Sequence, residues 1–468
     1  MKPSVFLSTV VCGLMVLPTV ASAQDQAWLK DRRYTEGAGY RVGDFELHPG
    51  AAAEFGYDSN YLHRSTLDPA LPPLGSLRLR LTPSLSFATL GAQRREGGAP
   101  PTVDFRGGLS LTYNEFIPIQ GSSAEKGVIG AQRNLGASLD LSAVFFPGHT
   151  WSGALSTNYL RAITATDQGV ATDAAGKTSA LTFNRDLPRA NAELIWTPGA
   201  GLFEWRLGYS FAGTIFEDTK FSTLTNLNNQ VTTRGRWRFL PRTSLMYDAS
   251  FGFITYTNPA SEIQGGKTGS HPMRARIGVN GLITPSFAIL ALAGWGASFY
   301  TPKLGADGTP SENFDSAIGQ VELKWFITPA ASAEPGATPS TLSSVAVGFL
   351  RDFYDSYIGT YYERDRGYLS FTYFYGGRFL VVVDGGAAPI IYPPIKVAAQ
   401  ASKIAAFTDI RVDASLLAEY RFKDAFGVNA SVRYNENINK QAIPVGNGMF
   451  DNLSFRQVEA YLGFRWLM

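Results

Sequence analysis

The sequence predicts an all-β fold: a transmembrane, antiparallel, up-and-down β-barrel of about 18 strands (16 to 20). Three observations predict it. Apolar and polar residues alternate along most of the chain, short and long connections alternate between these segments, and the alternation runs to the last of the 468 residues. Aromatic residues make up 13 % of the chain and charged residues 17 %, which suits a β-rich protein with a large apolar surface.

The alternation places apolar side chains on one face of each extended segment and polar side chains on the other. In residues 77–87, leucines occupy positions 77, 79, 81 and 85, whereas arginine, threonine and serine occupy positions 78, 80, 82, 84 and 86. After residue 23 the sequence contains no apolar stretch long enough for a transmembrane helix. The period of two therefore predicts strands throughout.

The connections differ in length in a regular way. Short links such as Phe146 to His149 and Leu240 to Arg242 alternate with longer polar stretches such as Thr164 to Ser179. A membrane barrel has short periplasmic turns and longer outer loops, and an even strand number puts both termini in the periplasm. Strands are expected near residues 45–57, 76–89, 102–115, 131–145, 151–163, 180–196, 202–216, 231–240, 244–257, 272–283, 287–300, 314–328, 341–353, 360–375, 378–390, 404–422, 425–436 and 454–467.

The first residues indicate export. Lys2 gives a positive start, an apolar run follows, and Ala21 and Ala23 form the small-x-small pattern of a signal peptidase site. We predict a signal peptide at residues 1–23, a short periplasmic segment at 24–44 and the barrel at 45–468. The single cysteine, Cys12, lies in the signal peptide, so the mature chain is expected to contain neither a disulfide nor a thiol nucleophile.

The C-terminal residues resemble an assembly signal. Apolar residues alternate from position 460 to the end, and Tyr461, Gly463, Trp466 and Met468 resemble the terminal pattern by which the outer-membrane assembly machinery recognises its clients, with Met in place of the usual Phe. This pattern favours a membrane barrel over a soluble β-sandwich. We therefore expect the cell outer membrane as the location, and the assembly machinery, lipid and lipopolysaccharide as partners.

Several other kinds of function are disfavoured. The net charge of +2, without runs of like charge, gives no reason to expect a nucleic-acid partner. The four histidines are scattered without metal-ligand spacing, so neither a metal nor a cofactor is expected. Gly265 to Thr268 resembles the end of a phosphate-binding loop but lacks its first glycine. We predict no enzymatic activity, although outer-membrane hydrolases need no Gly-x-Ser-x-Gly motif.

Charged residues on the polar face are the candidates for lining the lumen. These charged residues have two interpretations: they form cross-strand ion pairs that rigidify the wall, or they line a mildly basic, wet lumen that favours anionic or hydroxylated solutes. Both can hold. The candidates are Arg78, Arg80, Arg106, Arg206, Arg234, Arg236, Arg238, Arg274, Arg276, Arg411, Arg421, Arg433, Arg465, Asp104, Glu204, Asp248, Glu322, Asp413 and Glu419.

Tyrosines gather after the thirteenth expected strand. Tyr354, Tyr357, Tyr361 and Tyr362 stand among charged residues there. Aromatic residues at strand ends are usually part of the girdle at the membrane interface. A platform on which sugar rings stack is the alternative.

The start of the expected barrel resembles a known family. Gly43 to Pro49 followed by Tyr57 to Tyr61 is similar to the opening of porin-like outer-membrane barrels associated with exopolysaccharide gene clusters. The expected strand number is also similar to that of myxobacterial polysaccharide secretion barrels. The resemblance implies export of a surface or extracellular polysaccharide, with a separate periplasmic polysaccharide-export protein as a partner. A general or anion-preferring diffusion porin, and a structural or motility-linked barrel with a plugged lumen, remain the alternatives.

Overall fold

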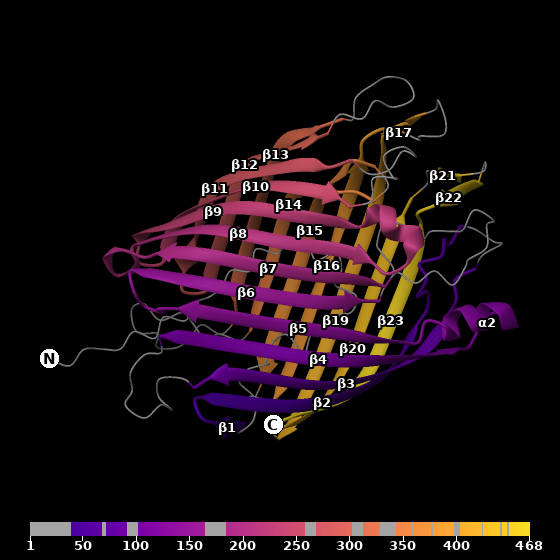
Figure 1. Ribbon diagram of the computed structural model, residues 1–468, viewed down its shortest axis with the longest axis horizontal. Coiled ribbons are helices and arrows are strands. Elements are labelled where there is room, and N and C mark those ends of the chain that lie inside the picture. The colour runs from indigo at the N-terminus through magenta and orange to yellow at the C-terminus, as the bar shows by residue number, and fades with distance from the viewer. Residues whose placement is uncertain are drawn as a thin grey trace.

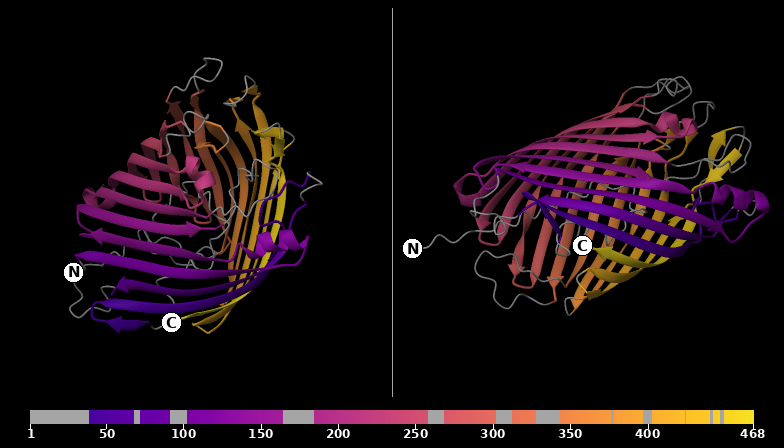
Figure 2. Two further views of the ribbon diagram at one scale, coloured as in Figure 1. Left: turned by 45° about the vertical axis from the view of Figure 1, so that its right-hand side comes forward. Right: turned by 60° about the horizontal axis from the view of Figure 1, so that its bottom comes forward.

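The wall of the molecule is one antiparallel β-sheet that closes on itself (Figures 1 and 2). The computed structural model describes residues 39–67, 72–90, 102–163, 184–257, 268–301, 312–327, 343–357, 359–375, 378–396, 403–423, 425–439, 442–446 and 449–468. The predicted signal peptide, with Ala21 and Ala23, lies outside these residues.

Eighteen long strands make the wall, which confirms the predicted fold class and strand number. Each strand pairs with the next one along the chain, so the barrel is of the up-and-down type. The strands are β2 (Phe45–Asp58), β3 (Ser76–Thr89), β4 (Val103–Pro118), β5 (Asn134–Phe145), β6 (Trp151–Ala162), β7 (Arg185–Trp196), β8 (Phe203–Phe216), β9 (Asn226–Leu240), β10 (Thr243–Tyr256), β11 (Ser270–Thr284), β12 (Phe287–Tyr300), β13 (Phe314–Phe326), β14 (Ser344–Asp355), β15 (Tyr361–Tyr375), β16 (Phe379–Tyr392), β19 (Phe407–Lys423), β20 (Phe426–Ile438) and β23 (Phe455–Leu467).

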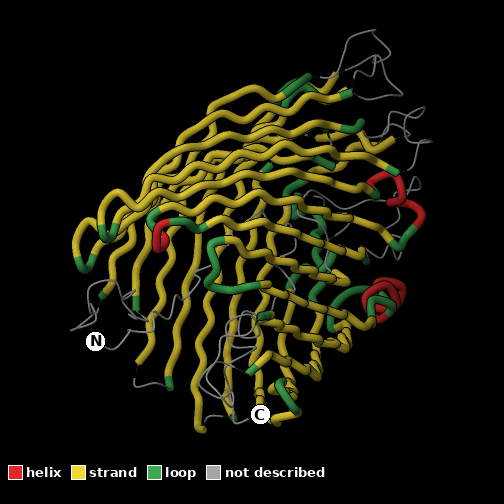
Figure 3. Tube along the Cα trace, turned by 60° about the vertical axis from the view of Figure 1, so that its left-hand side comes forward, coloured by secondary structure: helices red, strands yellow, loops and turns green. Residues whose placement is uncertain are grey.

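Several short helices and strands lie at the two ends of this wall (Figure 3). They are β1 (Tyr40–Val42), helix α2 (Ser123–Gly130), the 3-10 turns η1 (Gly199–Gly201) and η2 (Thr219–Leu224), and the hairpins β17 (Ile395–Lys396) with β18 (Lys403–Ile404) and β21 (Ala442–Gly446) with β22 (Met449–Asn452). Among the described residues, no helix is long and apolar enough to span a membrane.

Two local expectations were wrong. Helix α2 occupies part of a stretch expected to be a loop, because Ser122 and Glu125 form a capping box that satisfies the first free N–H groups of the helix. Strand β9 begins at Asn226 rather than near 231, because polar residues on its inward face extend the alternation. Strand β7 is described from Arg185; residues 180–183 of the strand expected there lie outside the described ranges.

The barrel is closed by the two ends of the chain. β2 pairs with β23 from Gly50 opposite Leu467 to Asp58 opposite Glu459. The N–H of Met468 donates to the carbonyl of Pro49 at 3.0 Å, and His48 Nδ1 lies 2.8 Å from the carbonyl oxygen of Met468. β1 pairs with the first residues of β2, beyond the reach of β23. Both termini of the barrel therefore lie at the end that carries the short turns.

The two faces of the wall differ sharply in exposure. On β23, Leu462 is 70 % exposed and Phe464 is 47 % exposed, whereas the inward residues Tyr461 and Arg465 are 6 % and 2 % exposed. Successive side chains on a strand point to opposite faces. The exposed apolar residues therefore form the outer surface, and the buried polar residues lie inside the barrel.

The outer surface carries an apolar belt of constant height. On several strands an outward aromatic residue lies at the short-turn end, and an outward charged residue lies ten positions away from it along the same strand. The pairs are Trp151 and Arg161, Trp196 and Asp186, Trp325 and Asp315, Tyr375 and Asp365, and Trp466 and Arg456. At about 3.3 Å per residue and a tilt of about 40°, ten residues span about 25 Å of height, the height of the apolar band in outer-membrane barrels. Between these two levels, the outward positions of the eighteen strands carry no charged residue in the described chain.

Candidate functional site

The interior of the barrel holds the candidate site, and its most covered part lies where the chain ends meet. Arg78 is fully buried, and its guanidinium lies 3.4 Å from Asp58 and 3.3 Å from Glu459. It also lies 4.6 Å from the ring centre of Phe116. Taking these charges out of water is costly unless they are paired, so Arg78 ties β2, β3, β4 and β23 together.

Arg80 lies two residues after Arg78 on β3 and also contacts both β2 and β23. Its guanidinium is 3.8 Å from Glu54 on β2, and it donates a hydrogen bond of 2.8 Å to the hydroxyl of Tyr461 on β23. Tyr461 was predicted as part of an assembly signal, and its hydroxyl group lies in the interior. Gly463 leaves space for Asn429 and Glu54, since a Cβ there would lie 2.1 Å from Asn429. Trp466 points outward in the belt.

A second buried group joins β19, β20 and β23. Glu419, 1 % exposed at its side chain, accepts hydrogen bonds from Arg421 at 2.7 Å and from Arg465 at 2.5 Å. Arg433 lies 4.0 Å from Glu459, and Arg411 lies over the ring of Phe455 at 5.6 Å.

The candidates on β7, β8 and β9 form a more open array. Arg206 lies 3.3 Å from Glu193 and 2.7 Å from Glu204, Arg236 lies 2.8 Å from Glu204, and Arg234 pairs with Glu193. The side chains of Arg234 and Arg236 are 31 % and 38 % exposed. We call Glu193, Glu204, Arg206, Arg234 and Arg236 the arginine ladder. Arg238 follows at the exposed end of β9.

The remaining candidates make contacts at other places on the wall. Arg276 lies 3.0 Å from Asp248, and Arg106 lies 3.1 Å from Asp104 near the short-turn end. Glu322 accepts a hydrogen bond of 2.7 Å from the hydroxyl of Tyr368. Arg274 lies 2.9 Å from Asp352, three strands away.

Asp413 pairs with two arginines that were not among the candidates. Arg364 lies 3.4 Å from it, and Arg366 binds it together with Asp384. The signal was available, because these arginines stand two residues apart on the polar face of a predicted strand, as Arg234 and Arg236 do. Nearly all the candidates therefore take part in ion pairs, the first of the two interpretations, while the ladder retains exposed charge.

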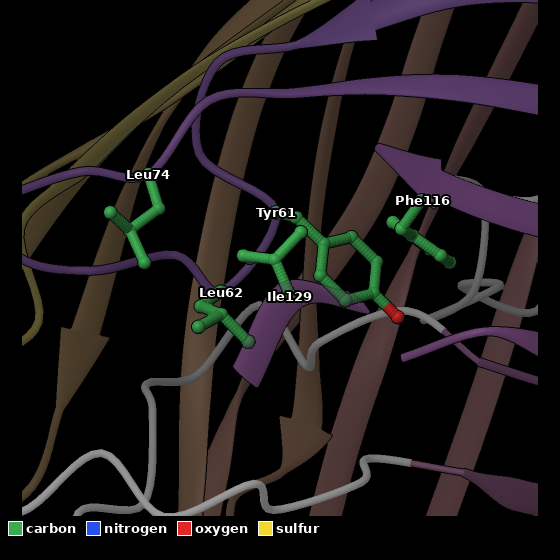
Figure 4. Close-up of a cluster of buried hydrophobic side chains, with 5 residues drawn as sticks. All are labelled: Tyr61, Leu62, Leu74, Phe116 and Ile129. Carbon is green, nitrogen blue, oxygen red and sulfur yellow. The ribbon is translucent and has the colours of Figure 1, made fainter. Parts of the chain in front are cut away.

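The long-loop end of the barrel is partly filled by its own chain. The segment after β2 turns inward, and Tyr61, Leu62, Leu74 and Phe116 pack together with Ile129 of helix α2 (Figure 4). Tyr61 donates a hydrogen bond to the carbonyl of Ile163 at the end of β6, and burial raises the pKa of its phenol to about 12. This packing, which we call the first mouth cluster, joins the ends of β2 to β6.

Helix α2 is held over this cluster by Glu125. The carboxylate accepts a hydrogen bond of 2.9 Å from the N–H of Ser122 and one of 3.0 Å from Arg64. These contacts hold the pKa of Glu125 below its usual value, and the hydrogen bond from the backbone N–H of Ser122 has the largest effect.

The tip of the β14–β15 hairpin fills another part of the mouth. β13 pairs with β14 from Phe326 to Gly319, so the last part of β14 leaves β13 and leans inward. Phe353 there stacks on Phe314 at 4.1 Å. The tyrosines singled out in the sequence pack against their neighbours, and Tyr354 and Tyr362, each 8 % exposed, lie against Ile390 and Tyr392. Their ring faces are covered, so neither the girdle nor the sugar platform describes these two.

The geometry defines a class: a closed transmembrane β-barrel with a polar, ion-paired interior. Within the described ranges, no group of three or more His, Cys, Asp or Glu residues is placed to hold a metal ion.

Comparison with known proteins finds solved structures of low similarity to this chain. No protein-family model and no curated protein matches the sequence. A solved structure titled bacterial polysaccharide outer membrane secretin is 9 % identical, with a TM-score of 0.31, over 92 % of this chain and 99 % of that one. OccAB2 of Acinetobacter baumannii is 9 % identical, with a TM-score of 0.44, over 91 % and 98 %. The siderophore receptor PirA of Pseudomonas aeruginosa is 9 % identical, with a TM-score of 0.39, over 92 % and 81 %. Similarities at this level carry no argument about cargo.

Proposed function

We propose that the chain is an outer-membrane channel and that it exports a surface or extracellular polysaccharide. The proposal rests on how side chains are distributed over a closed wall of eighteen strands: apolar side chains face outward and polar side chains face the interior. Barrels of sixteen to eighteen strands are wide enough for an aqueous path unless something fills them. The interior side chains then offer the passing molecule many exchangeable hydrogen bonds.

Polysaccharide fits this interior better than an apolar cargo. Sugars carry many hydroxyl groups, which both donate and accept hydrogen bonds. Along the wall, guanidinium groups can donate hydrogen bonds to these hydroxyls and carboxylate groups can accept hydrogen bonds from them. The opening of β2, Gly43 to Pro49, resembles barrels associated with exopolysaccharide genes. We place the short-turn end and both barrel termini in the periplasm, where a separate export protein would deliver the polymer. The long-loop end would then face lipopolysaccharide.

The test is deletion of the gene in the native cell. The proposal expects loss of surface polymer, with its periplasmic synthesis intact, and recovery when the gene is returned. Replacing Leu462 by Ile, a conservative change on the outer surface, is a matched complementing control. Normal surface polymer in the deletion strain would contradict export.

Two other functions are each favoured by a specific observation. The exposed arginines of the ladder favour an anion-preferring diffusion porin, and the inward packing at the mouth favours a structural barrel with a closed lumen. The purified barrel in a planar bilayer separates these cases. Conductance with normal surface polymer in the deletion strain supports the porin, and a barrel that never conducts supports the structural barrel.

A further inference from the structure

The interior charges are distributed unevenly around the barrel. In a ring of eighteen strands, β20 lies nine strands from β9 and therefore opposite it, so β7 to β11 face β16, β19, β20, β23 and β2 (Figures 1 and 2). On the inward positions of β7 to β11 arginines outnumber carboxylates, because Arg185, Arg189, Arg274 and Arg276 accompany the ladder and Asp248 is the further carboxylate. We call this side the basic wall.

The opposite side has the reverse balance. Among its described inward side chains carboxylates outnumber arginines, and they include Glu54, Asp58, Asp409, Glu419 and Glu459, none more than 4 % exposed. These carboxylates are covered by neighbouring side chains, whereas Arg234 and Arg236 on the basic wall are 31 % and 38 % exposed. Asp384 and Asp413 on the same side are 41 % and 25 % exposed, and both bind Arg366. The basic wall therefore presents exposed arginines opposite a side on which most carboxylates are covered.

The arginine ladder itself has more cations than anions. Arg206 and Arg234 share Glu193, and Arg206 and Arg236 share Glu204, so three guanidinium groups bind two carboxylates. Arg238 adds a further guanidinium at the end of the same strand. A planar guanidinium has five N–H donors, so an arginine that binds one carboxylate keeps donors for a second anion.

We propose that the ladder is a binding track for a polymer that carries regularly spaced anionic groups: carboxylate, sulfate or phosphate. The proposal rests on the proposed function and specifies its cargo. Arg234, Arg236 and Arg238 lie two residues apart, about 7 Å from one to the next along β9. A polyanion can bind several of these arginines at once, which raises its affinity above that of a single anion by raising the effective concentration. Competition from Glu193 and Glu204 keeps each contact exchangeable.

Equilibrium binding tests this without requiring that the barrel conducts. Fluorescent polygalacturonate oligomers are added to the purified barrel in lipid nanodiscs at low ionic strength, with dextran of equal length as the neutral probe. We expect at least about tenfold tighter binding of polygalacturonate, since hydrogen bonds to charged groups are worth about 1.5–3 kcal/mol and 1.4 kcal/mol is tenfold. Raising the salt should weaken binding through screening.

The variant Arg234→Ser with Arg236→Ser should lower that affinity about tenfold. Arg206 remains beside both Glu193 and Glu204, so neither carboxylate loses its last arginine. The matched control is Arg133→Ser with Arg456→Ser, which also removes two arginines, each 61 % exposed, but from the outer surface. The control should bind polygalacturonate as the wild type does.

Three outcomes would overturn the inference. Equal binding of polygalacturonate and dextran would mean that charge plays no part, and equal loss in the two double variants would place the effect outside the ladder. If galacturonate monomer competes as well as the oligomer per charged group, the wall serves small anions rather than a polymer. Failure of the proposed function is seen separately, as normal surface polymer in the deletion strain.

Discussion

The phenol of Tyr256, at the end of β10, donates a hydrogen bond to the carboxylate of Asp355, at the end of β14. Three strands, β11 to β13, lie between the two elements in the order of the wall, so this bond joins distant parts of the rim. Tyr357, two residues further on, packs against Phe216 of β8 with ring centres 6.1 Å apart. The β14–β15 tip is therefore fastened across the mouth.

Replacing Tyr256 by Phe should loosen this tip, because the ring is kept and the bond to Asp355 is lost. A hydrogen bond to a charged group is worth about 1.5–3 kcal/mol, so amide exchange in residues 352–357 should become at least about tenfold faster. Hydrogen exchange with mass spectrometry measures it. Tyr373→Phe, on the outer surface, is the control and should leave exchange unchanged. Equal protection in wild type and Tyr256→Phe would show that the bond does not hold the tip.

Replacing Arg78 by Met should destabilise the barrel, because Asp58 and Glu459 would remain buried without their shared cation. Breaking a buried ion pair in this way costs about 3–5 kcal/mol. The urea midpoint of unfolding, followed by tryptophan fluorescence, should fall accordingly. Neutralising all three groups, Arg78→Met with Asp58→Asn and Glu459→Gln, should recover most of the loss. An unchanged midpoint in the single variant would rule out a stabilising role for Arg78.

The outer belt predicts how the cost of an added charge depends on depth. Leu462 lies well inside the belt on β23, and Val458 lies one outward position from Arg456 at its edge. Arginine costs about 2–4 kcal/mol near the middle of the bilayer and about 0–1 kcal/mol near its interface. Leu462→Arg should therefore lower unfolding stability in lipid vesicles much more than Val458→Arg. Equal costs would mean that the belt is not the membrane-spanning zone.

Acid should release helix α2. The pKa of Glu125 is lowered in the folded chain from its ordinary 4.5, so this group stabilises the fold above that value and the contribution is lost as pH falls through the lowered pKa. A nitroxide on Lys126→Cys should become more mobile below about pH 4.5, as measured by electron spin resonance. With Glu125→Gln the label should already be mobile at pH 7 and change little with acid. If the label on the chain with Glu125 intact had the same mobility at pH 7 and at about pH 2, this role would be contradicted.

The wall was predictable because its signal is local. Leu77 and Arg78 must point to opposite faces wherever the strand lies, so the period of two predicts strands, strand number and faces from neighbouring residues. Ser122 and Glu125 also give a local signal, the capping box, and the helix they begin could have been predicted from it.

The interior contacts depend on distant parts of the chain. Arg78 contacts Glu459 because β2 pairs with β23 in one register. The alternation of apolar and polar residues along each strand does not specify that register. The same holds for Arg274 and Asp352, which meet because β14 leaves β13 and leans inward. Alternation placed Arg234 and Arg236 on the inner face, but their exposure depends on how few side chains cover them.

The contact between His48 and Met468 joins residues 420 positions apart, and it sets a condition on synthesis. Strand β2 lacks one of its two long neighbours until β23 has been synthesised, and bringing such distant segments together carries a large cost in chain entropy. Until then β2 and the newest strand expose unpaired edges, which promote aggregation. The barrel can therefore be closed only after β23 has been made, and until then its two edges must be kept from pairing with other chains.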